Sequence, residues 1–138
     1  MTDMETTRTQ VPGAPVVVKG GGPADIAHAR DVARDFAEAL DPTPACEAAQ
    51  TLALVVSELA TNAVRHGGGR YILRLGATAD AMQVAVSDPS PALPRERAPD
   101  LEGGAGGFGW SMVRRLAREV TLTPGPGRGK TIHARLPR

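Results

Sequence analysis

The sequence has one cysteine, almost no net charge and no long apolar run, and each of these absences excludes a class of protein. Cys46 has no partner for an intrachain disulfide or a cysteine-rich metal site, which fits a reducing compartment. Lysine and arginine number 16 against 15 for aspartate and glutamate, without the basic excess of an electrostatic nucleic-acid binder. No run of about 18 apolar residues exists, and residues 1–15 lack the apolar core of a signal peptide. We therefore expect a cytoplasmic protein that contacts neither a membrane nor nucleic acid directly.

What is present fits one folded domain. Hydrophobic residues make up 41% of the 138 residues and charged residues 22%, close to the averages of soluble globular domains. A chain of this length can bury one hydrophobic core but is short for two. Residues 1–15 are polar and rich in threonine, so we predict a flexible tail followed by a single domain at residues 16–138.

The spacing of apolar residues predicts both helices and strands. Apolar residues recur at steps of three and four in the predicted helices, and at every second position in the central predicted strands. Thr43 is placed as the N-cap of the second helix with Pro44 at its first position, and the glycines at 67–69 end that helix. The predicted helices cover residues 26–40, 44–66 and 110–117, and the predicted strands cover residues 16–18, 70–75, 82–87, 120–122 and 132–136.

The order of these elements predicts the fold class. Helices and hairpins are mixed without a strict alternation of strand and helix, which disfavours a doubly wound parallel sheet. We predict an α+β fold, a two-layer α/β sandwich in which a mixed, mostly antiparallel sheet is covered by helices on one face. Between Asp88 and Gly109 the pattern gives way to prolines and glycines, and a stretch of this length is usually functional or disordered.

Three polar residues lie in one row on the predicted second helix. Glu58, Asn62 and His66 are four residues apart, beside the apolar stripe that faces the core. Carboxylate and amide oxygens are ligands that Mg²⁺ prefers. The row indicates either a helix that borders a ligand cleft or an exposed polar edge of the helix, and spacing alone favours the polar edge.

Two further features carry weaker signals. Asp88 closes a predicted strand and precedes Pro89, which suits either a ligand acceptor at the end of the sheet or a turn residue. The glycines at 106, 107 and 109 lead into the third helix, where backbone N–H groups can bind phosphate, although such loops are often plain linkers. Gly129-Lys130-Thr131 enters a strand rather than a helix, which excludes a P-loop.

Four segments in register resemble the GHKL ATP-binding fold, which gyrase, heat-shock chaperones, mismatch-repair ATPases and sensor histidine kinases share. Residues 57–67 match the N box of that fold, in which Glu-x-x-x-Asn-Ala is followed by His-Gly. Residues 86–88 stand at the position of its adenine-reading aspartate, residues 107–113 match its second glycine box, and residues 129–132 match its terminal threonine strand. Within this group the chain is similar to the anti-sigma-factor serine/threonine kinases of bacteria.

The resemblance implies ATP and Mg²⁺ as cofactors and assigns roles to individual residues. It implies that Asn62 ligates Mg²⁺, that Asp88 accepts a hydrogen bond from the adenine amino group, and that Thr131 supports the base. Glu58 is the implied general base, able to deprotonate a serine hydroxyl. The other residues implied to hold the nucleotide, with the two glycines against its phosphates, are His66, Gly107, Phe108, Gly109 and Trp110.

For function, the resemblance implies an anti-sigma factor that is also a kinase. Such a protein holds a sigma factor and phosphorylates a serine or threonine of an anti-anti-sigma (STAS-type) protein. The alternative is a catalytically weak or inactive regulator that sequesters its partner stoichiometrically, motivated by Asp88-Pro89-Ser90, where the family continues Asp-x-Gly. A nucleic-acid regulator built on the arginines at 114, 115 and 118 is disfavoured by the net charge of +1. The sequence leaves open whether the chain forms a homodimer.

Overall fold

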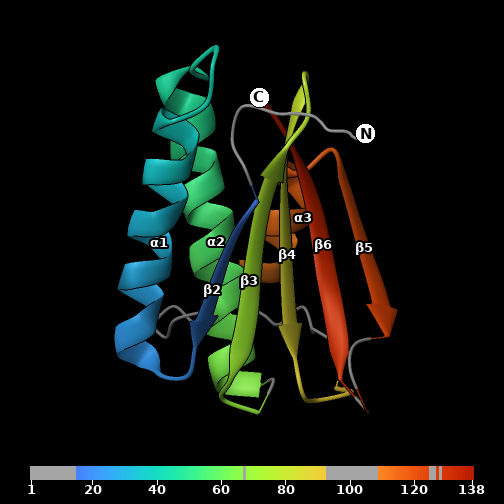
Figure 1. The fold of residues 1–138 in the computed structure, drawn as a ribbon. Helices are drawn as coiled ribbons and strands as arrows, with labels where there is room; N and C mark the ends of the chain where they lie inside the picture. The colour runs from blue at the N-terminus through green and yellow to red at the C-terminus, as the bar shows by residue number, and fades with distance from the viewer. Residues whose placement is uncertain (1–14, 67, 93–108, 125–126, 128) are drawn as a thin grey trace, which may run out of the picture.

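The computed structural model describes residues 15–66, 68–92, 109–124, 127 and 129–138. These residues form three helices and a five-stranded sheet (Figure 1). The helices are α1 (Pro23–Glu38), α2 (Cys46–His66) and α3 (Gly109–Leu116), and the strands are β2 (Val16–Gly20), β3 (Tyr71–Ala77), β4 (Ala81–Asp88), β5 (Glu119–Pro124) and β6 (Lys130–Pro137).

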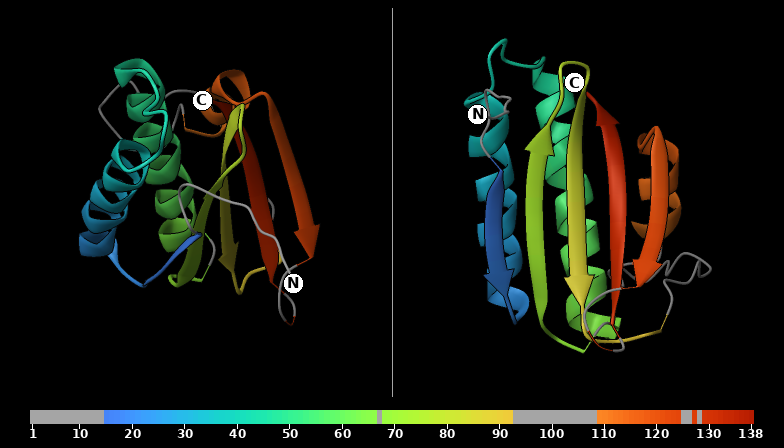
Figure 2. Two further views of the ribbon diagram at one scale, coloured as in Figure 1. Left: turned by 45° about the horizontal axis from the view of Figure 1, so that its top comes forward. Right: turned by 45° about the vertical axis from the view of Figure 1, so that its right-hand side comes forward.

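The sheet has the strand order β2-β3-β4-β6-β5, and each pair of neighbours is antiparallel. The helices cover one face of it: α1 contacts β2 and β3, α2 contacts β3, β4 and β6, and α3 contacts α2 and β5 (Figure 2). This arrangement confirms the predicted α+β two-layer sandwich with helices on one face. Among the described strands no parallel pair occurs, so the sheet is antiparallel rather than mixed.

The period of two in the central strands separates a buried face from an open face. On β3 the side chains of Tyr71, Leu73 and Leu75 are buried, while Arg74 between them is exposed. Burial of these apolar side chains against the helices is the main favourable contribution to folding. The largest fully buried side chains of the described residues come from every layer: Leu40, Leu52, Leu59, Leu73, Leu75, Met82, Ile132, Leu136, Val55, Val56, Val84 and Val86.

The two ends of α2 test the predicted capping signals. The helix begins at Cys46 rather than at Pro44, so the predicted N-cap was wrong. The physical reason is that the Thr43 hydroxyl donates to the carbonyl of Leu40 (3.0 Å) and so serves the end of the preceding segment. The predicted glycine stop is confirmed, because Gly69 N–H donates to the carbonyl of Ala63 (3.1 Å) and its φ of 85° suits a glycine.

The remaining predicted elements are found close to their expected places. The third helix starts at Gly109, and β5 and β6 form the predicted antiparallel hairpin. Most of the predicted tail and residues 93–108 of the predicted loop, including Gly107 and Phe108, lie outside the described residues. Within the part of the chain that the structure describes, no helix is long and apolar enough to cross a membrane.

Candidate functional site

The row of polar residues predicted on α2 borders the core. Glu58 and Asn62 are half-buried, while His66, at the last position of the helix, is exposed. Leu59 and Ala63, each the next residue along, are buried. The row therefore begins beside the core and reaches solvent at the C-terminal end of the helix, and its role as a ligand site stays a prediction.

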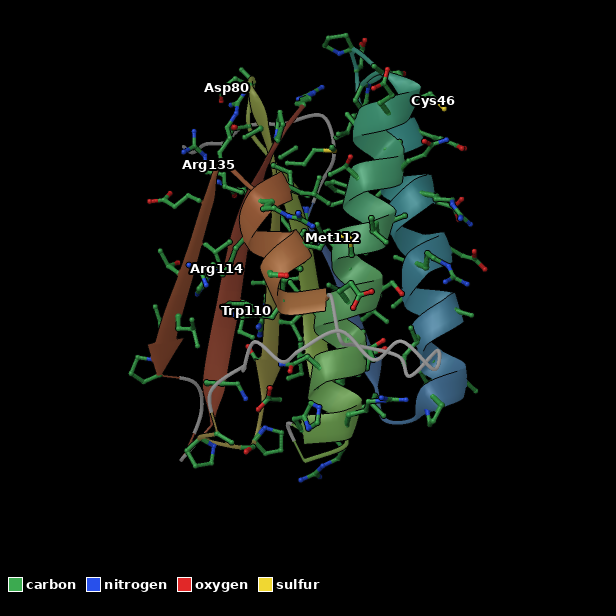
Figure 3. The ribbon with its side chains drawn as sticks, turned by 180° about the vertical axis from the view of Figure 1, so that it is seen from behind. Cys46, Asp80, Trp110, Met112, Arg114 and Arg135 are labelled. Atoms are coloured by element: carbon green, nitrogen blue, oxygen red, sulfur yellow. The ribbon has the colours of Figure 1, made fainter. Side chains whose placement is uncertain are left out.

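The carboxylate of Glu58 lies against the first residue of α3. A Cβ atom built on Gly109 would collide with Oε2 of Glu58, so only a glycine leaves room for this contact. Gly109 itself is buried, and Figure 3 shows α3 beside α2 on the helical side of the sheet. The N-terminus of α3 thus meets a carboxylate of α2, at a helix end whose positive dipole end attracts anions.

Burial changes the acidity of Glu58. Loss of solvent disfavours its charged form and raises the pKa of the carboxyl above its ordinary value of 4.5. A carboxylate with a raised pKa is a stronger base than one in water, which suits it to accept a proton.

Asp88 lies at the end of β4 in a buried ion pair with Lys130, its cross-strand neighbour on β6. The side chains of Asp88 and Lys130 are only 1% and 5% exposed. Oδ1 of Asp88 accepts hydrogen bonds from Lys130 Nζ (3.0 Å) and from the backbone N–H of Ser90 (2.9 Å). Oδ2 also lies 3.0 Å from Nζ but outside hydrogen-bond geometry, so this buried oxygen accepts no hydrogen bond.

The proline that follows Asp88 is packed between two glycines. A Cβ on Gly68, whose φ is 93°, would lie 2.9 Å from Cγ of Pro89. On the other side, a Cβ on Gly129 would collide with the carbonyl oxygen of Asp88. The segment from Asp88 to Ser90 is therefore held between the end of α2 and the start of β6, and Figure 1 shows α2 and β4 finishing at the same end of the molecule. Packing of Pro89 thus fixes this segment. In the GHKL pattern that the sequence resembles, the aspartate begins an Asp-x-Gly sequence, whereas this chain has Asp88-Pro89-Ser90.

Lys130, rather than Thr131, contacts the Asp88 carboxylate. In the antiparallel register Thr131 is paired with Ser87, and their hydroxyl oxygens are 2.7 Å apart. Both side chains alternate with core residues, Val86 on β4 and Ile132 on β6, so they lie on the sheet face opposite Asp88. The structure does not bring Thr131 to the other site residues, and its predicted role stays a prediction.

Trp110 occupies the second position of α3 and is partly buried, packed against the hydrophobic core. The described structure therefore gives this residue a packing contact, and its implied contact with a nucleotide stays a prediction. Lys130 was not among the site residues predicted from the sequence. The period of two along β6 could have identified this residue. Ile132 and Ala134 are buried under the helices, and Lys130 lies on the same face of the strand.

The fold and these contacts define an α+β domain in which the Glu58 carboxylate of α2 lies against the N-terminus of α3, and Asp88 pairs with Lys130 at the end of the sheet. The chain belongs to the histidine kinase-like ATPase domain family, which matches it over residues 22–136. This match runs from the start of α1 to the last but one residue of β6 and supports ATP binding by the domain. The chain matches none of the curated proteins with which it was compared.

Proposed function

We propose that this protein is an ATP-binding anti-sigma factor with serine/threonine kinase activity, and that it phosphorylates an anti-anti-sigma protein. The observation that carries the proposal is the contact between the Glu58 carboxylate and Gly109, one helical turn from Asn62. It supplies a proton acceptor, a metal ligand and a helix N-terminus within one region of the domain. The domain family supports the nucleotide, and the resemblance to anti-sigma kinases supports the partners.

The residues present fit ATP and Mg²⁺. Gly109 has no side chain, so the Glu58 carboxylate lies against the start of α3, and Asp88 keeps one buried oxygen without a donor. Asn62 would hold Mg²⁺ through its amide oxygen, because this ion is usually bound by one or two protein oxygens together with phosphates and water. When bound, Mg²⁺ would neutralise charge on the phosphoryl group during transfer.

In the proposed reaction, Glu58 takes the proton of the serine or threonine hydroxyl while the hydroxyl oxygen forms a bond to the γ-phosphorus of ATP. The bond from that phosphorus to the oxygen of ADP breaks, and ADP leaves with the bonding electron pair. The N–H groups at the start of α3 would stabilise the negative charge of the phosphates. The raised pKa of Glu58 favours the proton transfer.

A stoichiometric regulator remains the second candidate function. The observation that favours it is the ion pair of Asp88 with Lys130. A carboxylate that is already paired with an ammonium group forms a weaker hydrogen bond with the amino group of an incoming adenine. Incubating the protein with radiolabelled ATP, Mg²⁺ and candidate anti-anti-sigma proteins separates the two. Transfer of label to a partner serine or threonine supports the kinase, whereas tight partner binding with no transfer supports the regulator.

Gly109→Ala is expected to impair transfer without unfolding the protein. The new methyl group meets the mobile end of Glu58 rather than backbone, so the carboxylate moves aside and the fold is retained. We expect the free energy of unfolding to change by less than about 1 kcal/mol, because alanine suits a helix. Displacing a catalytic group by about 1 Å costs up to about 100-fold in rate, and a loss of this order is expected.

The matched control for this experiment is Gly76→Ala, where a Cβ would lie 3.8 Å from the nearest side-chain atom, in ordinary contact. Chemical denaturation and the label-transfer assay are measured for both variants. A Gly109→Ala protein that transfers phosphate as fast as Gly76→Ala would show that the contact between Gly109 and Glu58 has no part in the reaction.

A further inference from the structure

Lys130 has a hydrogen-bond donor left over beside the unsatisfied oxygen of Asp88. An ammonium group has three N–H donors, and those of Lys130 meet Asp88 Oδ1 (3.0 Å) and the Ser90 carbonyl (3.3 Å). Within the described residues the third donor meets no further acceptor of good geometry, although Asp88 Oδ2 is 3.0 Å from Nζ. A buried acceptor and a buried donor therefore stand side by side, each lacking one hydrogen bond.

We propose that Lys130 reads the base together with Asp88, with its ammonium donating directly to N1 of adenine while Asp88 Oδ2 accepts from the N6 amino group. This inference rests on the proposed binding of ATP. The Watson–Crick edge of adenine presents the amino donor next to the N1 acceptor, which is complementary to the acceptor and donor of the pair. Binding would satisfy both buried groups at once.

The position of the pair supports this role. Asp88 and Lys130 are directly opposed on neighbouring strands, on the helical face of the sheet where α2 packs. Ser90 fixes both members, since its N–H donates to Asp88 and its carbonyl accepts from Lys130. The oxygen and the ammonium are thus held in place before a ligand arrives, which lowers the entropy cost of binding. Thr131 lies on the sheet face away from the helices, so its hydroxyl cannot reach the N1 atom of an adenine that is bound to Asp88 on the helical face.

Nucleotide analogues test this contact on the wild-type protein. In 1-deaza-ATP a C–H group replaces N1, whereas 7-deaza-ATP changes the other edge of the base. Because a hydrogen bond to a buried charged donor is lost, we expect 1-deaza-ATP to bind about 10- to 100-fold more weakly than ATP. We expect 7-deaza-ATP to bind within about threefold of ATP. The measurement is isothermal titration calorimetry with Mg²⁺ present.

Substitution of the lysine provides the second arm. In Lys130→Met the preference for ATP over 1-deaza-ATP is expected to disappear, whereas Lys19→Met, which changes an exposed lysine of β2, is expected to keep it. Should Lys130→Met fail to fold, Asp88→Asn combined with Lys130→Met removes both charges and serves instead. Equal binding of ATP and 1-deaza-ATP to the wild type, or a preference that survives the loss of Lys130, overturns the inference alone. Absence of ATP binding overturns the proposed function as well.

Discussion

Replacing Lys130 with methionine is expected to lower the free energy of unfolding by about 3–5 kcal/mol. The substitution leaves Asp88, whose side chain is 1% exposed, as a buried carboxylate without its counter-charge. Removing one partner of a buried ion pair costs far more than the pair contributes, because the remaining charge has lost both water and its partner. Urea denaturation at neutral pH, followed by circular dichroism, measures the loss.

Two controls separate this effect from loss of packing. Asp88→Asn combined with Lys130→Met removes both charges, so we expect it to recover much of the stability lost in Lys130→Met alone. Lys19→Met makes the same substitution at an exposed position and is expected to stay within about 0.5 kcal/mol of the wild type. A Lys130→Met protein as stable as Lys19→Met would mean that the ion pair is not buried in solution.

Replacing Glu58 with glutamine is expected to reduce phosphoryl transfer by about 10²- to 10⁴-fold while nucleotide affinity stays within about tenfold. Glutamine keeps the shape that fits against Gly109 but cannot accept the hydroxyl proton. The wild-type rate is also expected to fall as pH is lowered through the raised pKa of Glu58, at a higher pH than an ordinary carboxyl would give. This acid limb should be absent in Glu58→Gln.

Stability measurements show whether Glu58→Gln loses activity because the protein has unfolded. Because the folded state raises the pKa of Glu58, the contribution of this group is most favourable at low pH and is lost as pH rises through that pKa. Glu58→Gln removes this dependence and is expected to be at least as stable as the wild type at pH 7. Glu47→Gln, in the exposed first turn of α2, is the matched control. Equal transfer rates in both variants would exclude Glu58 as the base.

The fold was predictable because its strands and helices carry clear periodicity. Tyr71, Leu73 and Leu75 alternate with polar or less buried positions, and a sheet covered on one face follows from such alternation. The start of α2 was not predictable from Thr43 and Pro44, since a threonine hydroxyl can serve the segment before it as well as the helix after it. Local sequence does not choose between those partners.

The site residues on α2 were predictable from the sequence, whereas the contacts between different helices and strands were not. The spacing of Glu58 and Asn62 places both on one row of a helix, and this required no tertiary information. The contacts of Glu58 with Gly109 and of Asp88 with Lys130 join residues 51 and 42 positions apart, so they depend on packing and register. The motif drew attention to Thr131, whereas strand alternation places Lys130 beside Asp88.

The measurement that most directly tests the account is a calorimetric titration of the purified protein with Mg-ATP, paired with thermal melting. We expect binding heat and a melting temperature that rises with nucleotide, because a ligand at 100 times its Kd stabilises the folded state by about 2.7 kcal/mol. Asp88→Asn is expected to weaken binding by about 10- to 100-fold. No heat and no change in melting at millimolar Mg-ATP would contradict nucleotide binding, and with it the assignment of Asn62, Asp88 and Gly109 to a nucleotide site.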